Sequence, residues 1–220
     1  KHSNGKVTVI AMESVKSEGI TRGLIINVDK VVRLITELAL ALEKSCGKKI
    51  EKFYVGTGGS FVYAKESSAY KRLSEKGSFS DEIIADLHKE NESVNLEYDA
   101  EVLKVLSQKY IIDNEFVESN PAGAHGTKIE GEFVVLGIKR NDKKTIQDCI
   151  EKAGFKVAGF VITPLATADT VLSEEEKELG AVSVDIGAGK TSVTVYQGGK
   201  LKRVAVLPFG GNVVTKDLAA

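Results

Sequence analysis

The apolar positions near the N-terminus follow first a strand period and then a helix period. Residues 6–14 alternate apolar and polar side chains and predict a strand. Asn27 precedes an apolar stripe at helical spacing that reaches about Ser45, and Gly47 follows it, which predicts a helix with an asparagine cap and a glycine stop. A short apolar run at 52–56 predicts the next strand. Strand, helix and strand in this order indicate a sheet with helices packed on it.

The pattern changes between residues 61 and 141. Alternating segments at 61–72, 101–113 and 128–138 predict strands, and Ser80 is the expected cap of a charged helix with a narrow apolar face. The order strand, helix, strand, strand predicts a compact unit inserted into the α/β region.

The α/β pattern returns after residue 141. Asn141 or Asp142 is the expected cap of a helix that closes at Gly154, and Thr163 is the expected cap of a later short helix. A hairpin and the start of a helix complete the chain. The predicted strands here lie at 157–162, 181–185, 191–196 and 201–207, and the helix at 213–220.

Composition and charge exclude several classes of protein. Of the 220 residues, 42% are hydrophobic and 28% are charged, as in a soluble globular protein. The net charge of −1 provides no electrostatic attraction for nucleic acid. The first residues lack the apolar region of a signal peptide, no apolar run is long enough for a membrane helix, and Cys46 and Cys149 lie far apart. We therefore expect a cytoplasmic protein with two buried thiols and no nucleic-acid partner.

The strongest chemical signal is the segment Val182-Ser-Val-Asp185-Ile-Gly187-Ala188-Gly189-Lys190-Thr191. An apolar strand delivers an aspartate into a glycine turn, and a second strand leaves the turn at once. Glycines allow a phosphate to approach the backbone N–H groups, and an aspartate at a strand end can hold a hydrated Mg²⁺. A tight hairpin whose glycines only serve the turn is the structural alternative.

Two other nucleotide-binding motifs do not fit this segment. A Walker A loop would need a glycine at Val184, and a dinucleotide-binding loop would need glycine or alanine at Ser192. Both loops must also open a helix, whereas Thr191-Ser-Val-Thr-Val-Tyr196 is β-branched strand sequence.

This segment is similar to the second phosphate loop of the actin, Hsp70 and sugar-kinase superfamily. In both, a strand leads into a DxGxGK turn, a second strand follows, and a Gly-Gly pair comes before a helix. Within this superfamily, the segments around this loop strongly resemble the FtsA family of bacterial cell-division proteins. The resemblance is carried by the segments 163–180 and 207–219 and, at the expected intervals, by 21–23, 109–113, 120–123 and 153–157.

This resemblance implies an α/β protein with a partial actin/Hsp70-like, or ribonuclease H-like, fold and an inserted SHS2 (1C) domain. Residues 1–60 and 142–178 would form subdomain 1A, 61–141 the inserted strand-helix-strand-strand domain, and 179–220 the start of subdomain 2A. The family's first phosphate loop, its subdomain 2B and its C-terminal membrane helix have no counterpart in this sequence, so we expect a chain truncated at both ends of the nucleotide site.

The resemblance also implies ATP and Mg²⁺ as ligands. The phosphates would contact Asp185, Gly187, Ala188, Gly189, Lys190 and Thr191, with Asp185 holding Mg²⁺ through water. The family usually has Gly-Gly-Gly-Thr where this chain has Gly187-Ala-Gly-Lys190, so the lysine charge would replace a hydroxyl contact. We expect at most a weak ATPase, and weak or no nucleotide binding by this chain alone, because only one of two phosphate loops is present.

The partners implied are those of the family. They are the ring protein FtsZ, through a subdomain outside this chain, further copies of the protein in a filament, and other division proteins that contact 61–141, with the faces at 61–70 and 115–125 as candidates. A C-terminal helix outside this chain would tether the protein to the cytoplasmic face of the inner membrane at the division site. The alternatives are an Hsp70-like chaperone, a sugar-kinase-like enzyme or a PilM-like pilus-assembly protein of the same fold.

Overall fold

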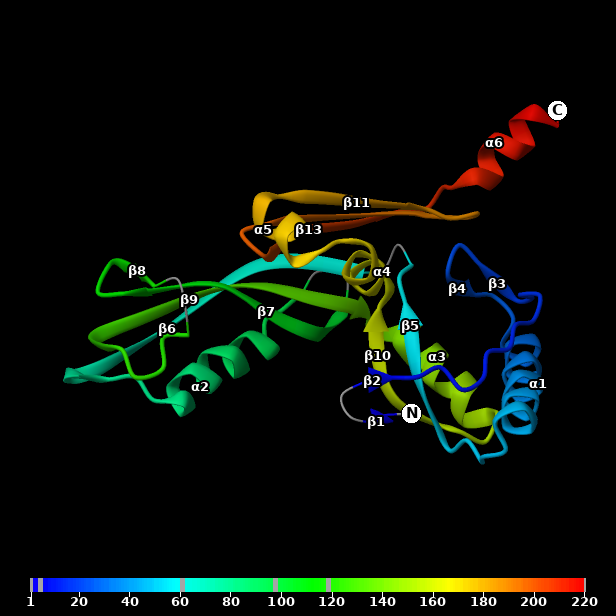
Figure 1. The fold of residues 1–220 in the computed structure, drawn as a ribbon, viewed down its shortest axis with the longest axis horizontal. Helices are drawn as coiled ribbons and strands as arrows, with labels where there is room; N and C mark the ends of the chain where they lie inside the picture. The colour runs from blue at the N-terminus through cyan, green and yellow to red at the C-terminus, as the bar shows by residue number, and fades with distance from the viewer. Residues whose placement is uncertain (1, 4–5, 60–61, 97–98, 118–119, 220) are drawn as a thin grey trace. The chain divides into compact units, whose positions relative to one another are not determined.

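The computed structural model describes residues 2–3, 6–59, 62–96, 99–117 and 120–219 (Figure 1). Its chain forms two compact units. Residues 1–57 and 141–161 form one unit, and 58–140 with 162–220 form the other. Phe61, at one end of an expected contact face, lies outside the described residues. The assignment of residues to family subdomains stays a prediction.

The first unit contains a helix with both expected caps. Helix α1 spans Val28–Cys46, and the side chain of Asn27 accepts a hydrogen bond from Lys30 N at 3.0 Å. At the other end, Gly47 has a φ of 67° and donates its N–H to Glu43 O at 2.9 Å. A left-handed glycine ends a helix because it has no Cβ to clash. The prediction of this helix is confirmed.

Strands β5 (Lys52–Thr57) and β10 (Lys156–Ile162) form a two-stranded sheet. The prediction of a strand in each of these two segments is confirmed. The rings of Phe53 and Phe155 meet edge to face at 5.1 Å. The remaining strands of this unit are short hairpin pairs. They are β1 (His2–Ser3) with β2 (Lys6–Val7), and β3 (Ile20–Thr21) with β4 (Leu24–Ile25).

The predicted strand at 6–14 is wrong beyond Val7. Residues 8–14 are not part of any strand in the described part of the chain, and the side chain of Met12 is 85% exposed. Alternation alone does not make a strand, because its backbone groups need a neighbouring strand to bond.

The predictions that both cysteines are buried differ in outcome. Cys149 is buried, and burial raises the pKa of its thiol, whereas Cys46 is only half-buried.

Two predicted helix caps are also wrong. Helix α3 spans Arg140–Lys152 and therefore begins before Asn141 and Asp142, because strand β9 (His125–Lys139) runs directly into it. Helix α4 spans Thr163–Val171, and its cap position is Ile162, with no side-chain hydrogen bond. Again a strand, β10, continues into the helix without a loop. A side-chain cap needs an acceptor on the residue just before the helix. That residue is Lys139 for α3 and Ile162 for α4, and neither side chain can accept a hydrogen bond.

The inserted segment folds as a four-stranded antiparallel sheet with one helix. The strand order is β6-β9-β7-β8, with β6 at Val62–Ser78, β7 at Ala100–Ile112 and β8 at Glu115–Val117. Helix α2 (Asp81–Glu92) lies along one face of this sheet (Figure 1). Leu87, from the helix, is fully buried against Phe79 and Phe133. The predicted order of strand, helix, strand, strand is confirmed, and β8 is an addition.

The last segment forms a three-stranded antiparallel sheet with three helices near it. Strands β11 (Ala181–Ile186), β12 (Thr191–Gln197) and β13 (Lys200–Leu207) pair in sequence order. One sheet face packs on α4 in a cluster that includes Leu165, Ala168, Tyr196 and Leu201. The short helix α5 (Glu174–Leu179) precedes β11, and α6 (Gly211–Leu218) follows β13. Within the described residues, no helix has the length and apolarity needed to cross a membrane.

Candidate functional site

The segment 185–190 forms a tight turn between two paired strands. Asp185 lies near the end of β11, opposite Ser192 of β12. The turn is closed by Gly187, whose N–H donates to Lys190 O at 2.9 Å. The apolar strands therefore deliver the aspartate to an exposed edge of the sheet, as the sequence predicts.

The turn has the free groups that an anion and a metal ion require. The backbone N–H groups of Ala188 and Gly189 donate to no acceptor in the described part of the chain. The Asp185 carboxylate is exposed, and within the same residues it has no hydrogen-bond or ion-pair partner. Backbone N–H groups in a turn can donate to phosphate oxygens, and an exposed carboxylate beside them can hold a hydrated Mg²⁺. The residues present therefore fit a metal-bound phosphate.

The start of helix α6 holds the other side of the turn. Gly211 N donates to Gly187 O at 2.9 Å, and Asn212 N donates to Ala188 O at 2.8 Å. A Cβ on Gly210 would lie 2.2 Å from Gly187 O, so only glycine allows this approach. The carbonyl groups of Gly187 and Ala188 are thus bonded to the start of the helix, whereas the N–H groups of Ala188 and Gly189 donate to no acceptor among the described residues.

The remaining polar side chains of the turn are held by the protein itself. Lys190 Nζ donates to Gly58 O at 2.7 Å, and burial lowers the pKa of its ammonium group, an effect that the charge of Asp185 partly opposes. The hydroxyl of Thr191 donates to Phe209 O at 3.0 Å. The expected contact between Lys190 and a phosphate therefore stays a prediction, with the ammonium group on a carbonyl in this structure.

Gly58 is a part of this site that sequence reasoning missed. A Cβ at Gly58 would lie 1.9 Å from Thr163 Oγ1, 3.0 Å from Pro164 Cδ and 3.2 Å from Lys190 Nζ. The position therefore requires a glycine for space, where the turn and the start of α4 approach the same backbone. A pair of glycines, Gly58-Gly59, directly after a strand was the available signal.

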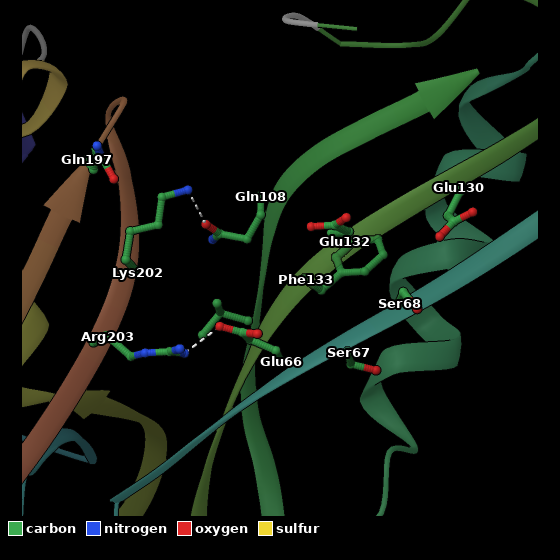
Figure 2. Close-up of a pocket in the computed structure, with 11 residues that line it drawn as sticks. Glu66, Ser67, Ser68, Gln108, Glu130, Glu132, Phe133, Gln197, Lys202 and Arg203 are labelled. Carbon is green, nitrogen blue, oxygen red and sulfur yellow. Dashed lines mark hydrogen bonds and ion pairs between the residues drawn. The ribbon is translucent and has the colours of Figure 1, made fainter. Parts of the chain in front are cut away.

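A separate groove lies between β13 and the sheet of the inserted unit, with a volume of about 650 Å³ (Figure 2). Lys202 Nζ donates to Gln108 Oε1 at 3.3 Å, and Arg203 pairs with Glu66. Glu130 and Glu132 line the side formed by the inserted unit. None of the residues of the 185–190 turn lines this groove.

Sequence comparison matches two families. Residues 182–220, which contain the turn, match "Cell division protein FtsA", and residues 59–136 match "SHS2 domain inserted in FTSA". The cell division protein FtsA of Neisseria meningitidis serogroup B is 28% identical over 214 residues, which are 97% of this chain and 51% of that protein. FtsA of Escherichia coli K12 is 29% identical over 216 residues, which are 98% of this chain and 51% of that protein. The chain thus spans about half the length of these curated relatives.

Structural comparison matches a solved structure of the PilM-PilN type IV pilus biogenesis complex. The TM-score is 0.61 at 15% sequence identity, with 95% of this chain and 56% of that chain covered. This likeness concerns the fold. The family matches cover both the inserted domain and the hairpin that carries the candidate site. Across almost its whole length the chain is thus similar to cell division proteins FtsA, and its actin-like α/β fold carries a segment that matches the SHS2 domain inserted in FtsA.

Proposed function

We propose that this chain is part of an FtsA-type cell-division scaffold, and that its turn at 185–190 binds the phosphates of Mg-ATP. The observation that carries the nucleotide part is the pair of free N–H groups at Ala188 and Gly189 beside the exposed carboxylate of Asp185. The N–H groups would bind phosphate oxygens, and Asp185 would orient the water shell of Mg²⁺. When bound, the metal ion neutralises phosphate charge.

The wider role follows the relatives, whose name is cell division protein. As part of the whole protein, this chain would contribute to a filament and to the tethering of the FtsZ ring to the cytoplasmic face of the membrane at the division site. Contacts with other division proteins would involve the domain at 61–141.

The nucleotide proposal is tested by titrating the ¹⁵N-labelled chain with Mg-ATP and following its backbone amide signals by NMR. We expect the largest shifts at the amides of 187–190, with a dissociation constant in the millimolar range, because one turn supplies only part of the contacts to a nucleotide. Asp185→Ala should weaken this binding about tenfold, since it removes the group on the metal side.

Asp217→Ala, on the exposed face of α6, is the matched control and should bind like the wild type. If the wild-type amides of 187–190 do not respond to Mg-ATP at millimolar concentrations, the turn is only a hairpin connection and the nucleotide proposal fails. Equal binding by Asp185→Ala and wild type would remove Asp185 from the site.

A further inference from the structure

The ammonium group of Lys190 joins segments that lie 132 positions apart in the sequence. It is half-buried and donates to a single backbone acceptor, Gly58 O, at 2.7 Å. A lysine that only adjusted the surface charge would extend into water, where its ammonium group is best solvated. This ammonium group instead loses part of its water shell and donates a hydrogen bond to the Gly58 carbonyl. The contact therefore fixes the position of the turn relative to Gly58.

The carbonyl that it contacts lies at the entrance to the inserted domain. Gly58 follows directly after β5, and the next residue, Gly59, accepts a hydrogen bond at 3.2 Å from the N–H of Val62. Val62 is the first residue of β6 and is buried in the cluster shared with α4 and β12. Two hydrogen bonds and the Gly58–Gly59 peptide bond therefore connect Lys190 to β6, the first strand of the inserted domain.

We propose that Lys190 is a positioning residue that couples the turn at 185–190 to the start of the inserted domain. In the free protein its ammonium group holds Gly58 and, through Gly59, the N–H of Val62. A phosphate on the turn competes for the same ammonium group, because an anionic oxygen is a stronger acceptor than a carbonyl. Phosphate binding therefore releases Gly58 and loosens the Val62 contact.

Such coupling is reciprocal: a partner that orders the start of β6 would change phosphate affinity by the same factor. The phosphate half of the inference rests on the proposed function, whereas the hold of Lys190 on Gly58 does not. The two halves are separated by measuring first the free protein and then the protein with Mg-ATP.

Hydrogen exchange of single amides, measured by NMR on the full chain, tests the first half. In Lys190→Met the Val62 amide should exchange about tenfold faster than in the wild type, because a charge-assisted hydrogen bond is lost. Lys190→Arg keeps a donor and should preserve the wild-type rate. The Leu87 amide, in the separate core under α2, should not change in any variant. Lys89→Met, on an exposed position of α2, is the control lysine.

Two results in the free protein would overturn the inference. An unchanged Val62 rate in Lys190→Met would mean that the contact positions nothing. Equal acceleration at Leu87 would mean that Lys190 stabilises the whole fold rather than this segment.

The second half is tested by adding Mg-ATP to the same samples. Wild-type Val62 should then approach the faster rate of Lys190→Met, and the variant should show no further change. If the amides of 187–190 respond to Mg-ATP while Val62 does not, the coupling to phosphate is wrong. If those amides do not respond either, the nucleotide function fails, and the comparison in the free protein alone decides the role of Lys190.

Discussion

At the scale of single residues, Asp113 shows how one carboxylate can organise a strand connection. It follows β7, has a φ of 47°, and accepts hydrogen bonds from the hydroxyl of Thr127 at 2.7 Å and from Lys128 N at 2.8 Å. These hydrogen bonds hold the pKa of the Asp113 carboxyl below its ordinary value, and the bond from the Thr127 hydroxyl has the largest effect. Because hydrogen bonds favour the charged form, its stabilising effect depends on ionisation.

The pH dependence of this effect has a definite sign. A lowered pKa contributes stability that is fully present above the unfolded-state value of 3.8 and is lost as the pH falls through the folded-state value. Asp113→Asn, which tolerates the left-handed backbone, should therefore lower the urea midpoint at pH 7. The difference from the wild type should shrink at pH values below about 4.

Asp217→Asn, on exposed α6, serves as the control and should leave the midpoint unchanged at both pH values. A difference between Asp113→Asn and wild type that stayed constant down to acid pH would show that the stabilising effect of Asp113 does not depend on its ionisation.

At the scale of elements, α2 packs on the inserted sheet through a narrow apolar face. The face is narrow because most of the side chains of this helix are charged or polar. Leu87 has no exposed surface and contacts the cluster of Phe79 and Phe133. Leu87→Ala should lower the free energy of unfolding by about 2–5 kcal/mol, because it removes buried carbon and leaves a cavity. Urea unfolding followed by circular dichroism measures this cost.

The matched control is Leu40→Ala on α1, where the leucine is 62% exposed and truncation should cost less than about 0.5 kcal/mol. Similar costs for both variants would mean that α2 does not pack on the sheet through Leu87.

At the scale of the whole molecule, the sheet of β11–β13 has a second apolar face that the described residues leave open. Val182, Val184 and Ile186 are 57%, 55% and 70% exposed, and they alternate with residues on the other face. Exposed apolar patches of this kind mark surfaces that associate. The isolated chain should therefore bind the dye ANS and self-associate at high concentration, and Val184→Lys should reduce both.

Val171→Lys replaces a valine that is similarly exposed, at 61%, but lies at the end of α4 outside this sheet. It should leave dye binding and self-association unchanged. Equal effects of the two lysine variants would show that general charge, and not this face, controls association. ANS fluorescence and sedimentation velocity are the two measurements.

The elements themselves could largely be predicted, because their signals are local. Asn27 and Gly47 contact groups within four residues of themselves, so their caps follow from the sequence order. Ser173 likewise forms a capping box with Glu176. The same locality explains the turn at 185–190, where the strands on both sides are consecutive in sequence. The failures at Asn141 and Thr163 arose where a strand continues into a helix, which local side-chain preference does not reveal.

The sequence by itself thus determined the order of elements, the inserted unit and the candidate turn with Asp185 at its start. Only the tertiary structure decided that residues 8–14 form no strand, that Gly58 lies against Thr163, and that Lys190 reaches Gly58 O. The physical reason is range. Caps and periodicity depend on neighbours within a turn or two, whereas strand pairing and the Lys190 contact bring together backbone groups far apart in the chain, which no local pattern encodes.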